Sequence, residues 1–367
     1  MSDDLVPDVA PPMGDGSPTE VPPAPARSRA PLWERIALIA GPIVVVLIVL
    51  SITIRFPKVI ISPGSANSTQ KAVTITGAPT TPINGAVYFL TVRVTNNRPN
   101  VWRLGYAWIE GDSEIVDEDK FLGGLSRKQS DQLDTADMSI SQETATVVAL
   151  EKLGYTVPIT GATVAAVDPK GPANGKLQAG DVIVSIDGAA ITSPETVGQA
   201  VRSKSPGSTV VFTVERNGKR LDEAITTYDA GQGKARVGIV TSPRYSFPIS
   251  VKIDSGDVSG PSAGLAFTIT IIDELTTGQL TGGKKVAITG TIGPDGQVGP
   301  VGGVPQKAVT ARDAGASIMI VPADEVGEAN KHAGAMKVVG VRTLDEALAG
   351  LVANGGDPLP EIKPKAA

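Results

Sequence analysis

The chain carries a serine and a lysine in settings that suit a nucleophile and its base. Ser262 lies in the glycine-rich segment GPSAG, and Lys307 lies 45 residues later in the segment VGGVPQK. A serine hydroxyl becomes a good nucleophile only when a base takes its proton. The chain has one histidine, His332, and no cysteine. An acyl-transfer reaction would therefore use His332, a carboxylate or a lysine held neutral as its base.

The residues around Ser262 predict the start of a helix. Proline is tolerated in a first helical turn, because the N–H groups there have no partner within the helix. Pro261 therefore places Ser262 at the positive end of a helix over 262–275, whose apolar composition predicts burial. Main-chain N–H groups of Ser262 with Gly260 or Ala263 are candidate oxyanion donors. The alternative is an ordinary serine at a helix start.

Lys307 occupies a similar position, because Pro305 marks the first turn of a second predicted helix. A free lysine has a pKa near 10.4 and cannot serve as a base at neutral pH. Burial beside apolar residues and the positive helix end would both disfavour its charged form. The alternative is a solvent-exposed lysine, which is where most lysines lie.

Composition limits the classes of function. The 367 residues suffice for two or three domains, and 33 Lys and Arg nearly balance 38 Asp and Glu. This balance argues against a nucleic-acid partner. The absence of cysteine excludes disulfides, thiol catalysis and cysteine-ligated zinc. We expect no metal and no cofactor.

One segment has the character of a membrane span. Residues 36–54 contain no charge and would extend about 28 Å as a helix, close to the thickness of a bilayer core. The alternative is a cleaved signal peptide, which the length, late start and missing cleavage site disfavour. Arg27, Arg29 and Arg35 precede the span and weakly favour an N-terminus inside the cell. The catalytic part would then lie outside.

Residues 155–228 alternate short predicted strands and tight turns around one predicted helix that begins at Ser193-Pro194. The pattern Gly-Pro-Ala, Leu-x-x-Gly-Asp-Val-Ile and Ile-Asp-Gly resembles a PDZ domain, a small β-barrel with one helix along its groove. The resemblance implies binding of an extended peptide or chain terminus by strand addition. Val197, Ala200 and Val201 are then groove candidates, with core packing as the alternative. Leu153-Gly154-Tyr155-Thr156 is the candidate carboxylate-binding loop.

A second resemblance covers about 110 residues. The segment DSGDVSGPSAGL around Ser262, and the motifs from Ile288-Thr289-Gly290 to Ala314-Gly315, resemble the Lon-type serine peptidases. The resemblance implies that Ser262 is the nucleophile, that Lys307 is the general base and that Thr289 supports the pair by hydrogen bonding. The family often has an acidic residue three positions before the serine, where this chain has Ser259.

ATP dependence does not transfer with this resemblance. The segment Gly278 to Lys285 nearly matches a Walker loop, but Lys285 replaces the Ser or Thr that holds magnesium. We interpret it as a plain loop, and no motor is recognised in the chain. The order of membrane span, PDZ module and Lon-like domain resembles the membrane-anchored PDZ–Lon-like peptidases of Gram-positive bacteria.

The predicted fold is multidomain α+β. It comprises a disordered tail over 1–35, a transmembrane helix over 36–54, an α+β segment over 62–154 contiguous with the peptidase, a PDZ domain over 155–228, a Lon-type α/β proteolytic domain over 236–352 and a loose tail over 353–367. The predicted function is a single-pass, membrane-anchored, ATP-independent serine endopeptidase whose PDZ module recruits protein or peptide substrates. The family resemblance also implies a homo-oligomer, as a hexameric ring.

Two alternatives remain open. One is a Ser-His-Asp hydrolase, because Gly260-x-Ser262-x-Gly264 fits a nucleophile elbow and His332 follows it in the chain. The other is a PDZ adaptor with an inactive peptidase fold.

Overall fold

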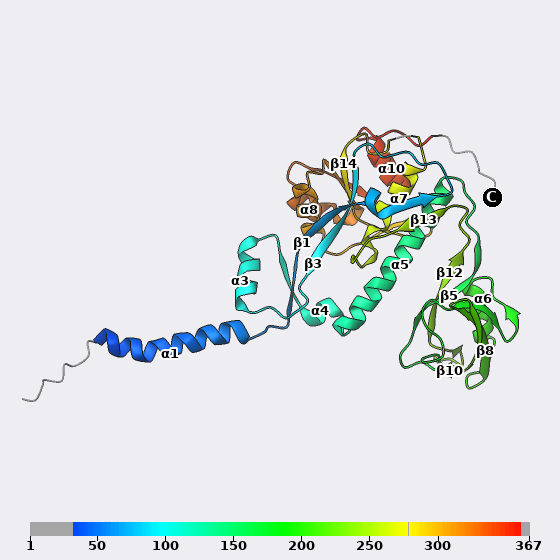
Figure 1. Ribbon diagram of the computed structural model, residues 1–367, viewed down its shortest axis with the longest axis horizontal. Coiled ribbons are helices and arrows are strands. Elements are labelled where there is room, and N and C mark those ends of the chain that lie inside the picture. The colour runs from blue at the N-terminus through cyan, green and yellow to red at the C-terminus, as the bar shows by residue number, and fades with distance from the viewer. Residues whose placement is uncertain (1–31, 278, 361–367) are drawn as a thin grey trace, which may run out of the picture. The chain divides into compact units, whose positions relative to one another are not determined.

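The computed structural model describes residues 32–277 and 279–360, with side chains from residue 40 onward (Figure 1). Most of the predicted tail at 1–35 and the last residues of the tail at 353–367 lie outside the described part. Two compact units are present, one ending at Ile54 and the other beginning at Arg55.

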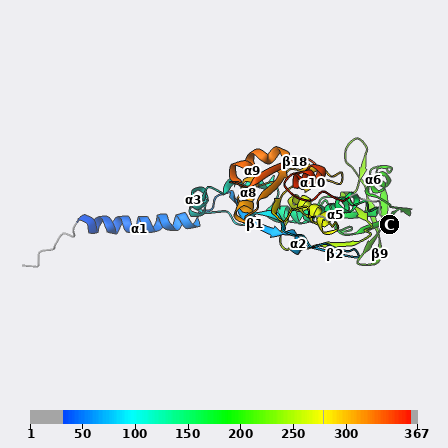
Figure 2. The ribbon, with the colours of Figure 1, turned by 90° about the horizontal axis from the view of Figure 1, so that it is seen from above.

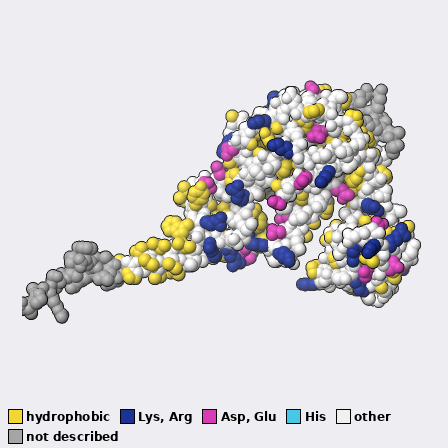
Figure 3. All heavy atoms as spheres, in the orientation of Figure 1, with side chains coloured by type: hydrophobic (Ala, Val, Ile, Leu, Met, Phe, Trp, Pro, Cys, Tyr) yellow, Lys and Arg dark blue, Asp and Glu magenta, His cyan; other side chains and the backbone are white. Residues whose placement is uncertain are grey.

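The first unit contains the helix α1 (Leu32–Thr53), on which the expected membrane span at 36–54 falls. The side chains of residues 36–39 lie outside the described part. From Ile43 to Ile52 its large apolar side chains are exposed, and Figure 3 shows hydrophobic side chains along the face of the helix that is in view. Among the residues that the structure describes, no helix combines the length and apolar character needed to cross a membrane.

The second unit is built on a mixed six-stranded sheet. Its order is β18 (Lys337–Val341), β17 (Ile318–Pro322), β14 (Lys285–Ile288), β3 (Ala86–Val94), β1 (Lys58–Ser68) and β4 (Glu114–Asp117). β3, β14, β17 and β18 are parallel to one another, and β1 runs antiparallel to β3 and β4. The segment that precedes the PDZ module therefore supplies half of the strands of this sheet.

Helices cover both faces of the sheet, because alternate residues of a strand point to opposite sides. The helices that accompany the six-stranded sheet are α2 (Thr69–Ala72), α3 (Val101–Glu110), α4 (Glu118–Leu122), α5 (Arg127–Lys152), α7 (Gly264–Glu274), α8 (Val304–Asp313), α9 (Val326–His332) and α10 (Leu344–Val352). Val286 and Ile288 pack toward α5, α7 and α10, whereas Ala287 packs toward α8 and α9. Figure 2 shows α8 and α9 side by side. Two short ribbons complete this part, β2 (Val73–Thr76) with β13 (Ser250–Ile253) and β15 (Thr291–Ile292) with β16 (Val298–Gly299).

Helix α5 is longer than a start at Ser139 would make it. It begins after Ser126, whose side chain accepts a hydrogen bond from the Gln129 N–H while Gln129 bonds back to Ser126. This is a capping box. Ser139 lies inside the helix and its hydroxyl donates to the Thr135 carbonyl. The extra turns matter, because α5 contacts the segment that holds Ser262.

The residues with PDZ-like motifs form a separate sheet around one helix. Its strands follow the order β12 (Ile239–Tyr245), β5 (Ile159–Val167), β6 (Val182–Ile186), β8 (Thr209–Arg216) and β9 (Lys219–Thr226), with β7 (Ala189–Ala190) paired to β6. β10 (Tyr228–Asp229) pairs with β11 (Ala235–Arg236), and α6 (Pro194–Arg202) packs on this core. The sheet takes an edge strand, β12, from beyond residue 228, where the sequence had suggested that the module ends.

Candidate active site and peptide groove

Ser262, Lys307 and Thr289 come together at the carboxyl end of β14. Lys307 Nζ lies 2.9 Å from Ser262 Oγ and 3.1 Å from Thr289 Oγ1. Thr289 directly follows β14, Ser262 lies in the turn that opens α7 on one face of the sheet, and Lys307 lies in the first turn of α8 on the other. Two helices on opposite faces thus direct their amino-terminal ends at one point, a common place for sites in α/β sheets.

The segment around Ser262 is held by main-chain and side-chain bonds. The Gly290 N–H donates to the Ser262 carbonyl at 2.9 Å, and the Ser141 hydroxyl of α5 donates to the Pro261 carbonyl at 2.9 Å. A side chain at position 264 would meet Ser141 Oγ at 2.6 Å. Gly264 is therefore required by the close approach of α5 to the start of α7.

The main-chain N–H groups expected to bind an oxyanion differ in whether they are already hydrogen-bonded. The Gly260 N–H already donates to the Asp134 carbonyl at 2.8 Å, so it is not available as a donor to an oxyanion. The expectation for Gly260 therefore fails in this conformation because α5 reaches back to this loop. The Ser262 N–H donates no hydrogen bond to any residue in the described part of the chain. Ala263 follows in the same short turn and is buried.

Lys307 lies in dry surroundings. Its side chain is 3% exposed and Thr289 is fully buried, whereas Ser262 is only half-buried and so can meet a substrate. Burial lowers the pKa of Lys307 from 10.5 to about 8, and the nearby carboxylate of Glu325 acts in the opposite direction. A shift of this size corresponds to about 3 kcal/mol against the charged amine. The neutral amine is thus accessible near physiological pH.

Glu325 is a site residue that sequence reasoning missed. Its Oε1 accepts a hydrogen bond from the Val301 N–H at 2.8 Å, which fastens the loop before α8. Burial raises the pKa of this carboxyl group. No local pattern marks it, because β17 separates Glu325 from the segment that it holds.

His332 takes no part in this cluster. It ends α9, and its backbone carbonyl accepts a hydrogen bond from Arg312 at 3.4 Å. Across the described ranges, no hydrogen bond joins His332 to Ser262. The partner of Ser262 in this geometry is the lysine.

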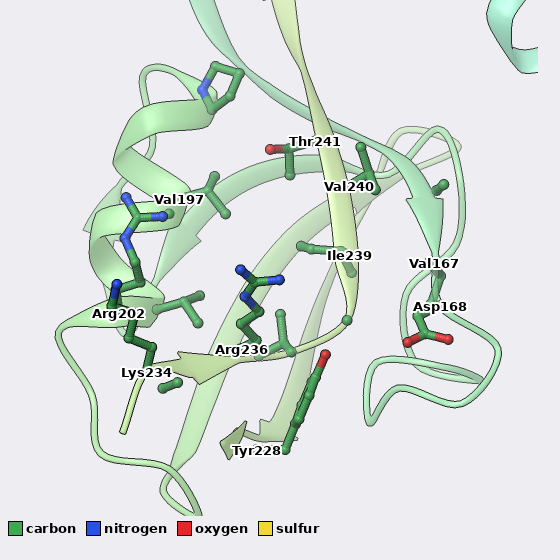
Figure 4. Close-up of a pocket in the computed structure, with 17 residues that line it drawn as sticks. Val167, Asp168, Val197, Arg202, Tyr228, Lys234, Arg236, Ile239, Val240 and Thr241 are labelled. Atoms are coloured by element: carbon green, nitrogen blue, oxygen red, sulfur yellow. The ribbon is translucent and has the colours of Figure 1, made fainter. Parts of the chain in front are cut away.

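A groove of about 550 Å³ lies between α6 and β12 (Figure 4). Val197 and Val201 are buried and line it, whereas Ala200 packs on the core nearby without lining it. β12 is at the edge of its sheet, so its side facing α6 has no partner strand. An extended chain could add there.

The start of β12 presents free donors to this groove. The N–H groups of Val237 and Gly238 donate no hydrogen bond within the part that the structure describes, whereas their carbonyls accept from Ala173 and Asp168. Gly238 has φ +79, and a Cβ at this position would lie 3.0 Å from Gly171 Cα, so a larger residue would be strained here. Val237 and Gly238 line the groove, whereas residues 153–156, the expected carboxylate-binding loop, are not among its lining residues. In the sequence these N–H groups belong to the segment Val-Gly-Ile at 237–239, which lies past the expected end of the PDZ domain at 228.

Comparison with known families agrees with both parts of the structure. Residues 126–227 match the PDZ domain model, and residues 234–353 match the Lon protease (S16) C-terminal proteolytic domain model. Residues 127–152 of the first match form α5, outside the PDZ sheet, and the edge strand β12 of that sheet falls within the second match.

Individual relatives cover parts of the chain. A probable periplasmic serine endoprotease, DegP-like, of Halomonas elongata is 27% identical over 49% of this chain and 39% of its own length. Lon protease 2 of Bacillus subtilis is 32% identical over 32% of this chain and 20% of its own length. The chain thus spans well under half of either relative. The crystal structure of the PDZ domain of an SdrC-like protein from Listeria innocua is 30% identical over 22% of this chain and 92% of that chain, with a TM-score of 0.21. The chain contains a PDZ domain followed by a C-terminal proteolytic domain of the Lon (S16) type.

Proposed function

We propose that the chain is a serine endopeptidase in which Ser262 is the nucleophile and Lys307 the general base. The observation that carries this proposal is the 2.9 Å approach of a buried amine to a half-exposed hydroxyl. The match to the Lon proteolytic domain supports the same reaction.

In the proposed reaction the neutral amine of Lys307 accepts the proton of Ser262 Oγ as this oxygen attacks the peptide carbonyl. The Ser262 N–H is placed to donate to the oxyanion that forms. The lysine then returns the proton to the leaving amine, and water hydrolyses the ester. Thr289 accepts a hydrogen bond from the amine and donates one to the Ser262 carbonyl at 3.4 Å. It therefore acts as a positioning residue that aims the lysine.

Reaction of Ser262 with a peptidyl phosphonate tests this proposal. We expect the rate of labelling to rise with pH around a midpoint near 8, because only the deprotonated Lys307 accepts the proton. About one tenth of the amine is neutral at pH 7 and about nine tenths at pH 9. Mass spectrometry of the labelled peptide, with the rate followed from pH 6 to 10, provides the measurement.

Two results would count against the proposal. Labelling that is absent at every pH would favour the adaptor with an inactive fold. Labelling that is lost in His332→Ala but kept in Lys307→Ala would identify a histidine base instead.

We also propose that the enzyme works without ATP and that its PDZ domain recruits substrate. Gly278 lies outside the described residues, and the rest of the near-Walker segment forms turns that lead into the strand β14 rather than a helix. A P-loop needs a helix start to hold phosphate. The groove between α6 and β12, with its free N–H groups at Val237 and Gly238, suits an extended segment that ends in a carboxylate.

We further propose that residues 36–54 anchor the chain in the cell membrane, with the catalytic part outside the cytoplasm. The uncharged run in the sequence and the exposed apolar side chains of α1 support this. We expect the full chain to stay in membranes after alkaline carbonate extraction. Val45→Lys with Val49→Lys should release it, because each charge costs about 3 kcal/mol at the centre of a span. Val211→Lys with Val240→Lys, at exposed positions of the PDZ domain, is the matched control. Extraction of the unaltered chain by carbonate would contradict the proposal.

A further inference from the structure

Positive charge gathers at one end of the groove between α6 and β12. Arg202, Lys234 and Arg236 lie around the end where β12 begins, and Val197 and Thr241 lie at the opposite end (Figure 4). We call Arg202, Lys234 and Arg236 the basic cluster. The acidic side chain that lines the groove is Asp168, on the β5 side.

The basic cluster is not neutralised by its surroundings. All three side chains are exposed, and in residues 40–277 and 279–360 none of them forms an ion pair. The chain as a whole has a net charge of −5, so this concentration of positive charge is a local feature. Unpaired guanidinium groups are well suited to bind carboxylates through paired hydrogen bonds.

A single terminal carboxylate would not use all of this charge. The free N–H groups of Val237 and Gly238 already provide two donors for it. Three cations around the same end leave charge for further anionic groups on the ligand. Arg202 and Arg236 belong to different walls of the groove, so they can contact side chains that point to opposite sides of an extended chain.

The rest of the groove favours a peptide over other anions. Val201, Val237 and Ile239 supply an apolar lining. The free edge of β12 offers main-chain donors and acceptors to an added strand. Nucleic acids and lipid headgroups would satisfy the basic cluster but not this edge.

We propose that the PDZ domain selects protein C-termini that carry acidic side chains directly before an apolar last residue. This inference deepens the recruitment role proposed above and rests on it. The acidic side chains bind the basic cluster, the terminal carboxylate binds at Val237 and Gly238, and the last side chain enters the apolar lining.

Fluorescence anisotropy of labelled peptides on the full chain carrying Ser262→Ala tests this selection without cleavage. The probe is fluorescein-Gly-Ser-Gly-Thr-Glu-Glu-Val with a free C-terminus, and its neutral counterpart replaces both Glu by Gln. We expect the Glu peptide to bind about tenfold more tightly at low salt, since each charge-assisted bond at an exposed site contributes modestly. The difference should shrink as ionic strength rises.

Variants locate the effect. Arg202→Gln with Arg236→Gln should remove the preference for Glu over Gln, whereas Arg220→Gln, an exposed arginine on β9 away from the groove, should keep it. Thermal melting of each variant shows that the domain is folded. Equal affinity for the two peptides, binding of neither, or a preference that survives the double variant overturns the proposal.

Casein hydrolysis by the unaltered chain separates this inference from the peptidase function. Cleavage of casein without a preference for the Glu peptide leaves the peptidase standing and rejects the selection. A preference for the Glu peptide without cleavage leaves the selection standing and rejects the peptidase.

Discussion

Lys307→Ala should lower the rate of peptide hydrolysis at least about a thousandfold, and Ser262→Ala should do the same. The two groups act as one unit, so the double variant should be no worse than either single variant. Lys337→Ala, which removes an exposed lysine of β18, is the matched control and should keep full activity. Hydrolysis of a fluorogenic peptide, with enzyme concentration set by phosphonate labelling of the unaltered chain, measures the loss.

Substitution of Thr289 should lower kcat less than substitution of Lys307, and a hydroxyl at this position should restore the rate. Thr289→Val removes the hydroxyl that lies 3.1 Å from Lys307 Nζ, so we expect a tenfold to hundredfold loss in kcat, by analogy with outer groups that orient a reacting one. Thr289→Ser keeps the hydroxyl and should recover most of the rate. A group with a merely structural role would not show this rescue.

The expected loss of activity in Lys307 variants does not come from unfolding, because replacing the buried amine should stabilise the folded chain. The pKa of Lys307 is lower in the folded chain than in the unfolded chain, so the folded state binds fewer protons between about pH 8 and 10.5. The free energy of unfolding of the unaltered chain therefore rises with pH through this window. Lys307→Met removes the buried amine and should stabilise the chain by about 1–3 kcal/mol at pH 7. A Lys307→Met chain that is folded and still active would disprove the dyad.

Arg216→Met should destabilise the PDZ domain by about 3–5 kcal/mol, because it leaves a buried charge without its partner. Asp181 is fully buried, and Arg216 donates to both of its oxygens at 2.6 Å. Burial would raise the pKa of Asp181, but the hydrogen bonds from Arg216 and from the Gln178 N–H outweigh it and the pKa is lowered. Denaturant unfolding followed by circular dichroism measures the loss.

The pH dependence provides a second readout for this ion pair. Since the folded-state pKa of Asp181 is below its unfolded value, its contribution is present above the unfolded pKa and is lost as pH falls through the folded one. Arg220→Met, on the neighbouring strand and without an ion pair among the described residues, is the control and should change stability little. If Arg216→Met lowers the free energy of unfolding no more than Arg220→Met does, the ion pair with Asp181 does not stabilise the domain.

Several elements could be predicted because their signals are local. Pro261 and Pro305 mark the first turns that hold Ser262 and Lys307, and the structure begins helical turns at both. Ser193-Pro194 likewise begins α6. The start of α5 was wrong in the sequence interpretation because two Ser-x-x-Gln patterns occur, at Ser126 and Ser139, and the choice between them depends on tertiary packing.

Other features depend on residues that are distant in the chain. The edge strand β12 joins the PDZ sheet only by pairing with β5, so a boundary drawn from composition stops short of it. The loss of Gly260 as an oxyanion donor follows from Asp134, more than a hundred residues earlier. The expected homo-oligomeric ring stays a prediction.

By itself the sequence determined which residues carry chemistry, because helix starts, turns and apolar runs depend on neighbours within a few positions. Only the tertiary structure decided that Lys307 is dry and adjacent to Ser262, because both the burial that lowers its pKa and the 2.9 Å approach arise from two helices packed on opposite faces of one sheet. It also decided where positive charge gathers in the groove, since Arg202 and Arg236 line the same groove only when α6 folds against the entry to β12.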